Sequence, residues 1–89
     1  MYKLSKETVT ELGKVTLRYE LISSLSETDI PYSTYGIEVT LEGNGFRDSR
    51  RIDDISTEKA EVMALMDSMS DGEVTPVTAA DVVDDYLNW

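Results

Sequence analysis

The stretch Val15-Thr16-Leu17-Arg18-Tyr19-Glu20-Leu21 decides the fold class, because apolar and polar side chains alternate along it without a break. A period of two gives a β-strand one apolar and one polar face. Residues 35–42, Tyr-Gly-Ile-Glu-Val-Thr-Leu-Glu, repeat the pattern. The first half of the chain therefore predicts a sheet with one apolar face.

Turn signals on either side of these two segments predict three or four antiparallel strands. Residues 2–10 predict a weaker strand that returns through residues 12–13 (Leu-Gly). Residues 44–45 (Asn-Gly) predict a type I′ hairpin, since both residue types tolerate positive φ. The returning strand, residues 46–52, is rich in charge and predicts an edge. Residues 23–33 predict a long loop.

Apolar spacing changes to a period of 3.6 in the second half. Val62, Leu65, Met66 and Met69 fall at i, i+3, i+4 and i+7, which indicates one buried stripe of a helix. Ser56 is the expected N-cap of this helix. It is expected to end near Ser70, with Gly72 as the C′ residue.

A second helix is expected after Pro76. Thr78 is its predicted N-cap, and Val77 is spaced to pack against Val82 as a hydrophobic staple. Its predicted buried stripe is Ala79, Val82, Val83, Tyr86 and Leu87. The whole pattern predicts a single α+β domain, residues 1–89, in which a three- to four-stranded antiparallel sheet packs against two short C-terminal helices.

Composition excludes several classes of chemistry. The 89 residues contain no cysteine and no histidine, which excludes thiolate metal sites, disulfides and Ser-His-Asp catalysis. No apolar run resembles a signal peptide or a membrane span, so we expect a cytoplasmic protein. We expect neither a cofactor nor enzymatic activity.

The net charge of −10 belongs to the second half of the chain. Residues 1–52 carry eight acids and seven bases, whereas residues 53–89 carry ten acids and one base, Lys59. Such a surface repels nucleic acid and anionic membranes and attracts basic proteins or cations.

Two acidic motifs resemble metal sites and fail the test of ligand spacing. Asp67 and Asp71 match the first and fifth positions of a calcium loop, but Met69 and Thr78 stand at the third and twelfth. Asp81, Asp84 and Asp85 share one helix face, with no second cluster to complete a magnesium site. A carboxylate-based, metal-dependent enzyme is therefore the least favoured hypothesis, and no metal site is expected.

Three segments carry a family resemblance. These are residues 35–37 (Tyr-Gly-Ile), residues 52–57 (Ile-Asp-Asp-Ile-Ser-Thr), and Pro76 with residues 81–87. They resemble a family of small uncharacterised proteins from Firmicutes, mainly clostridia, that is known only as a domain of unknown function. The resemblance implies a fold and a bacterial cytoplasmic setting, and no activity.

Two functions remain open. The first is a non-enzymatic protein-binding domain that occupies a basic surface of a partner, as nucleic-acid mimics and anti-CRISPR inhibitors do. Its predicted contact residues are acidic: Glu58, Glu61, Asp67, Asp71, Glu73, Asp81, Asp84 and Asp85.

The second is a bacterial adaptor or regulatory module that binds through apolar sheet and loop surface. Its candidate contacts are Tyr32, Tyr35 and Trp89. The expected partner in both cases is a protein, with neither nucleic acid nor membrane bound directly, and a homodimer through a sheet face or edge stays open.

Overall fold

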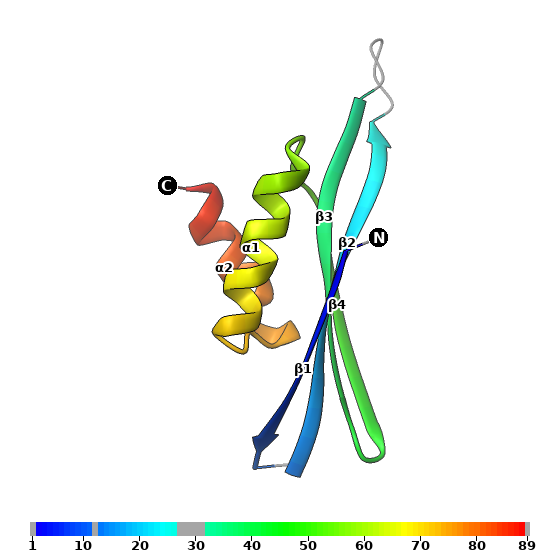
Figure 1. The fold of residues 1–89 in the computed structure, drawn as a ribbon, viewed down its shortest axis with the longest axis vertical. Coiled ribbons are helices and arrows are strands. Elements are labelled where there is room, and N and C mark those ends of the chain that lie inside the picture. The colour runs from blue at the N-terminus through cyan, green and yellow to red at the C-terminus, as the bar shows by residue number, and fades with distance from the viewer. Residues whose placement is uncertain (1, 12, 27–31, 89) are drawn as a thin grey trace.

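The computed structural model describes residues 2–11, 13–26 and 32–88, which form a four-stranded antiparallel sheet with two helices on one face (Figure 1). The elements are β1 (Lys3–Thr10), β2 (Gly13–Ser26), β3 (Tyr32–Gly43), β4 (Phe46–Ser56), α1 (Lys59–Asp71) and α2 (Pro76–Leu87). The strand order is β1-β2-β3-β4, so β2 and β3 are central and β1 and β4 are edges. The predicted α+β class is confirmed. Within the described residues, no helix is long and apolar enough to cross a membrane.

The core lies between the helices and the sheet face that the alternating pattern predicted. Tyr19 is paired opposite Val39, and Leu21 opposite Ile37. Opposite residues share a face, so these apolar side chains meet under the helices. The largest fully buried side chains are Val15, Leu17, Tyr19, Ile37, Val39, Val62, Met66 and Met69. The predicted stripe of the first helix is confirmed in full.

The second helix departs from its predicted stripe. Ala79 and Val83 are buried, and Val82 and Tyr86 pack against the core from its margin. The prediction is wrong for Leu87, which is 54% exposed because α2 ends there, at the margin of the layer.

The two central strands are longer than predicted. All described residues of the expected loop, residues 23–33, are strand: β2 continues to Ser26, which pairs with Tyr32, and residues 27–31 lie outside the described residues. Cross-strand bonds satisfy this backbone, and Thr34 Oγ1 adds a 3.4 Å hydrogen bond to the Ser24 carbonyl. The β2–β3 hairpin consequently extends past the helices (Figure 1).

A bulge in β4 lies beside the central strand β3. Tyr35 pairs with Ser56 but Ile37 pairs with Ile52, so three residues of β4 oppose one of β3. Asp54 takes a φ of 58° there. Gly36 faces the bulge, and a Cβ at this position would collide with the Ile52 carbonyl oxygen. The bulge redirects the strand so that Ile55 joins the core.

The turn between β3 and β4 is located correctly but assigned to the wrong type. Gly43 pairs with Phe46, which confirms the two-residue turn at Asn44-Gly45. Gly45 has a φ of 85°, whereas Asn44 is not among the described positive-φ residues. A type I′ turn needs positive φ at both positions, so the φ pattern is that of a type II turn.

The N-terminus of α1 lies two residues beyond the prediction. Its N-cap residue is Glu58, not Ser56. Ser56 still takes part, because its Oγ accepts the Glu58 backbone N–H at 3.0 Å and donates to Glu61 at 3.0 Å. The hydroxyl thus orders the chain just before the helix instead of capping it.

The C-terminus of α1 forms a Schellman motif without glycine at the left-handed position. Gly72 is the C-cap with a φ of −85°, and Glu73 takes the left-handed φ of 53°. The Glu73 N–H donates to Ser70 O and the Val74 N–H to Met69 O, at 3.1 and 2.9 Å. Gly72 as C′ is therefore wrong by one residue.

The start of α2 also differs from the prediction. Thr75 is the N-cap and Pro76 is the first helical residue, where a missing N–H costs nothing. Thr78 lies in the first turn and donates its Oγ1 proton to Thr75 O at 3.3 Å. The staple is wrong too, since Val77 is 79% exposed.

Candidate protein-binding surface

The helical layer, which we define as residues 58–88, concentrates the negative charge of the molecule. It holds eight carboxylates and one base, Lys59, for a formal charge of 1 − 8 = −7. The carboxylates belong to Glu58, Glu61, Asp67, Asp71, Glu73, Asp81, Asp84 and Asp85, and all eight residues are exposed. The predicted acidic residues thus share one layer of the fold, opposite the uncovered face of the sheet (Figure 1).

The two helices run in opposite directions, so at each end of the layer the start of one helix lies near the end of the other (Figure 1). The Tyr86 hydroxyl of α2 donates to Glu61 Oε2 of α1 at 3.5 Å. The start of α1 therefore lies beside the end of α2, where Asp84 and Asp85 stand. Asp71 lies at the opposite end of α1. The acidic surface is extended rather than a single cluster.

Glu61 organises the first of these two ends. Besides Tyr86, its Oε2 accepts a 3.0 Å hydrogen bond from Ser56 Oγ. Desolvation and then the nearby Glu61 charge raise the pKa of Tyr86. The tyrosine therefore keeps its proton and remains a donor that joins the two helices through the glutamate.

Near the other end of α1, Asp67 and Glu73 contact residues in and just before the edge strand β1. Asp67 Oδ1 accepts a 2.6 Å hydrogen bond from the Tyr2 hydroxyl, and this bond is the main cause of a raised Tyr2 pKa. Lys6 Nζ lies 3.8 Å from Glu73 Oε1 and donates to Ser70 O at 3.2 Å. Lys6 thereby supplies a cation where the helix dipole favours one.

The three aspartates of α2 have no such partners. Among the described residues, no base lies within ion-pair distance of Asp81, Asp84 or Asp85. Asn88 supplies the hydrogen bonds at the C-terminus of this helix. Its backbone N–H and its side-chain Nδ2 both donate to Asp84 O, at 3.1 and 2.8 Å. Negative side chains near a helix C-terminus oppose the dipole, so local stability does not account for them.

The outer face, by which we mean the sheet face turned away from the helices, has balanced charges. Ion pairs there join Lys14 to Glu7 at 3.0 Å, Arg18 to Glu42 at 3.1 Å, and Arg51 to Asp53 at 2.9 Å. In register, Lys3 stands opposite Glu20, and Glu38 opposite Arg51. Lys14, Arg18 and Arg51 are thus paired with sheet acids, whereas Lys6 is the only described base that forms an ion pair with the helical layer.

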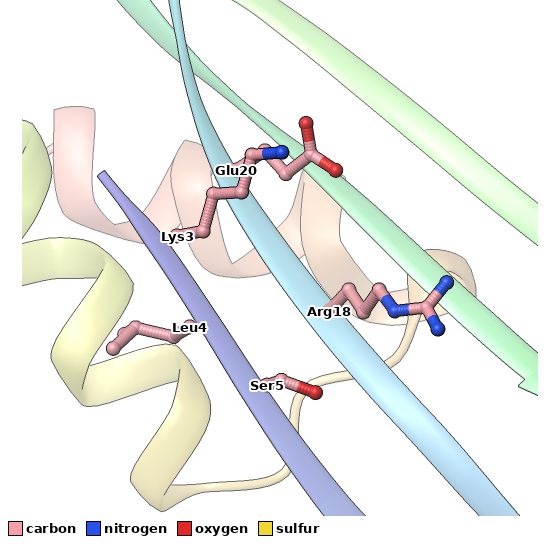
Figure 2. Close-up of a pocket in the computed structure, with 5 residues that line it drawn as sticks. All are labelled: Lys3, Leu4, Ser5, Arg18 and Glu20. Carbon is pink, nitrogen blue, oxygen red and sulfur yellow. The ribbon is translucent and has the colours of Figure 1, made fainter. Parts of the chain in front are cut away.

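An open hollow of about 320 Å³ on the outer face shows the same balance (Figure 2). Lys3, Ser5, Arg18 and Glu20 project from β1 and β2 on this side, whereas Leu4 points toward α1. Both signs of charge line the hollow, and Arg18 is already paired with Glu42. It therefore has no net charge with which to attract an ionic ligand.

The acids do not converge on a metal site. Within the described part of the chain, no group of three or more acidic residues is placed to hold a metal ion. This applies to Asp81, Asp84 and Asp85 as well as to Asp67 and Asp71, all of which lie on exposed helix surface.

The aromatic candidates are only partly described. Tyr35 is half-buried beside the β4 bulge and packs against the core. The Tyr32 side chain and Trp89 lie outside the described residues. Large exposed apolar side chains that sequence reasoning did not select are Val9, Leu25 and Val77. Val77 was predicted to pack against Val82 in a hydrophobic staple, so its spacing in the sequence did not indicate that it is exposed.

These features define a class of protein: a small α+β domain with a charge-balanced sheet face and an acidic helical layer. The chain belongs to DUF6514, a family of unknown function whose model matches residues 1–89. This membership agrees with the resemblance carried by residues 35–37 and 52–57, which form the β4 bulge and its glycine contact. No curated protein and no solved structure shows a significant match to the chain.

Proposed function

We propose that this protein is a non-enzymatic binding module that seats a basic surface of another protein on its helical layer. The observation that supports this proposal is that the carboxylates of the helical layer lack neighbouring bases to compensate their charge. Of the eight carboxylates, only Glu73 forms an ion pair with a described base, and that pair, with Lys6, spans 3.8 Å.

The uneven distribution of charge determines the side from which a basic partner approaches the module. The acids of the helical layer create a field on one side of the molecule, and the outer face adds little to it because its charges are paired. Such a field accelerates encounter with a positive surface and orients it before contact. The rows of exposed carboxylates also suit a partner whose basic surface normally binds phosphates, so the sharper form of the proposal is an inhibitor that mimics nucleic acid.

The decisive experiment is affinity capture from a bacterial lysate with two variants of equal charge. The helical-layer variant D81N/D84N/D85N and the outer-face variant E20Q/E38Q/E42Q each remove three acids, so their formal net charge is −10 + 3 = −7. We expect the wild type and the outer-face variant to capture the same basic protein, and the helical-layer variant to lose it.

Salt and nucleic acid complete the test. Captured protein should elute well below about 1 M NaCl, where the Debye length falls to about 3 Å. Competition by the partner's own nucleic acid supports the inhibitor form. Capture that is equal for all three proteins, or that persists in high salt, contradicts the proposal.

The adaptor hypothesis rests on a separate observation. Leu25 is 66% exposed on the β2–β3 hairpin, beyond the cover of the helices. An apolar contact there should survive high salt and weaken in Leu25→Ser. The same capture experiment therefore separates the two functions.

A further inference from the structure

The free edge of β4 is regular enough to pair with another strand. From Phe46 to Ile52 every residue of β4 follows one continuous register with β3, and the bulge begins only after Ile52. On its other side this segment has no neighbouring strand in the described sheet. Such an edge presents a row of N–H and C=O groups that can extend the sheet.

Two charged side chains of this edge lie on the face that the helices cover. Asp48 is paired opposite Leu41, and Arg50 opposite Val39, a core residue. Opposite residues share a face, so Asp48 and Arg50 project toward the helical layer. Neither forms an ion pair with another described residue. They are therefore available to charges outside the chain.

An apolar flank of α2 lies above the same edge. A hollow of about 380 Å³ separates residues 48–50 of β4 from Pro76, Val77 and Ala80 of α2. Val77 is 79% exposed beside it. The edge strand and this flank form one continuous surface.

We propose that a second copy of this chain docks on this surface, with the two β4 strands antiparallel about a two-fold axis at Ser49. The four-stranded sheets then join into one sheet of eight strands with both helical layers on one side. In this register Phe46 lies opposite Ile52 of the second copy, and Asp48 lies opposite Arg50 of the second copy. The contact between the two β4 strands, which we call the seam, then contains two ion pairs and two apolar pairs on the face that the helices cover.

The charge of the residue on the two-fold axis favours Ser49 as the centre of the pairing. Because opposite residues share a face, a two-fold pairing must place one residue of β4 opposite its own copy. From Arg47 to Arg51, every residue except Ser49 is charged. Any other centre in this segment therefore sets two like charges against each other, which destabilises a strand pair.

The remaining charges tolerate the arrangement. On the outer face Arg47 meets Arg51 of the second copy, but Arg51 is held by Asp53 at 2.9 Å and Arg47 stands opposite Glu42. Asp81 and Asp84 follow Val77 by four and seven residues, or about 6 and 10 Å along α2, and neither lines the hollow beside Ser49. The eight acids of the helical layer lie outside β4, so the dimer and the proposed function are tested with different variants.

The test uses charge exchange and the oligomeric mass in solution. By sedimentation equilibrium we expect the wild type to reach twice its 10.0 kDa mass at protein concentrations up to about 1 mM, which allows for a small, weak interface. Asp48→Arg and Arg50→Asp should each be monomeric, because each sets like charges across the seam. An equimolar mixture of the two variants should restore the dimer mass, since every pair is then complementary.

A cysteine probe locates the axis. The natural chain has no cysteine, so Ser49→Cys should give a single disulfide-linked dimer under mild oxidation, and Ser5→Cys on the other edge strand should not. A wild type that stays monomeric up to about 1 mM overturns the proposal. So does a dimer that both charge variants retain, or cross-linking through position 5 instead of position 49.

Discussion

At the scale of single residues, this fold holds some side chains and backbone angles against their intrinsic preferences. Glu73 occupies a left-handed φ of 53° at the end of α1, a place where helices usually have glycine. Its neighbour Gly72 has an ordinary φ of −85° and does not need to be glycine. The contact between Glu73 and Lys6 compensates part of the strain.

Glu73→Gly should therefore stabilise the protein. Glycine removes a left-handed strain of about 1–2 kcal/mol, its greater freedom in the unfolded chain offsets about 0.5–1 kcal/mol, and the lost Lys6 contact offsets a few tenths because both side chains are partly exposed. We expect a net gain of about 0.5 kcal/mol in the free energy of unfolding, measured by urea denaturation. Glu73→Ala loses the same contact and keeps the strain, so it is the control. A glycine variant no more stable than the alanine variant would refute this account.

Tyr19 makes stability depend on alkaline pH. Its hydroxyl donates to Val74 O at 2.7 Å, and burial, followed by the Glu73 charge, raises its pKa to about 12. The unfolded chain releases this proton near pH 10, so the contribution is complete below about pH 10 and is lost as the pH rises through about 12.

We expect Tyr19→Phe to be less stable than the wild type by about 1–2 kcal/mol near pH 7, since the Val74 carbonyl loses its donor. The difference in unfolding free energy between the wild type and Tyr19→Phe should become smaller above about pH 10, because only the wild type carries the titrating hydroxyl at position 19. Unfolding free energies across that range test the prediction. Val39→Ala, which removes buried apolar volume and no proton, should keep a constant difference. A Tyr19→Phe difference that also stays constant would contradict the linkage.

At the scale of elements, the β4 bulge is the feature on which the rest of the architecture depends. It lets one strand pair with β3 over most of its length and then turn toward the helices, which brings Ile55 into the core and Ser56 to the start of α1. The bulge closes tightly over Gly36, where no side chain fits. The glycine between Tyr35 and Ile37 in the alternating pattern is thus a requirement of the fold.

Gly36→Ala should destabilise the protein by about 3 kcal/mol or more, since the obstacle is the Ile52 backbone rather than a flexible side chain. Gly72→Ala is the matched control: a Cβ there meets no atom closer than 3.5 Å and φ is −85°. We expect that variant to stay within about 0.5 kcal/mol of the wild type. Thermal and urea unfolding measure both, and similar losses in the two variants would show that the bulge does not need the glycine.

At the scale of the whole molecule, charge divides along the layers of the fold. The helical layer holds eight of the eighteen acids of the chain, whereas the described sheet bases Lys14, Arg18 and Arg51 are paired with sheet acids. Folding therefore brings like charges together on one side. Repulsion within that side lowers stability most at low ionic strength.

Added salt should consequently stabilise the wild type. Raising NaCl from about 0.01 M to about 0.1 M shortens the Debye length from about 30 Å to about 10 Å, so the unfolding midpoint should rise. The rise should be smaller in D81N/D84N/D85N, which relieves the repulsion, than in E20Q/E38Q/E42Q, which has the same net charge. Differential scanning calorimetry provides the measurement. Equal salt dependence in both variants would show that net charge, not its location, sets the effect.

The sequence by itself determined the fold class, the core and the location of the charge. Alternation in residues 15–21 and 35–42 identified the buried sheet face, and the stripe from Val62 to Met69 identified the buried side of α1, because periodicity is a local property. The acidic half of the chain was likewise visible by counting.

Only the tertiary structure decided which of these residues meet. The contacts of Asp67 with Tyr2 and of Glu73 with Lys6 join residues more than sixty positions apart, and no local pattern encodes them. The helix ends differ from the prediction by one to three residues: the N-cap of α1 lies two residues after the end of β4, and α2 begins at Pro76, whose missing N–H costs nothing at that position. Whether Arg50 faces the helices or the solvent depends on strand register, which is a property of the assembled sheet.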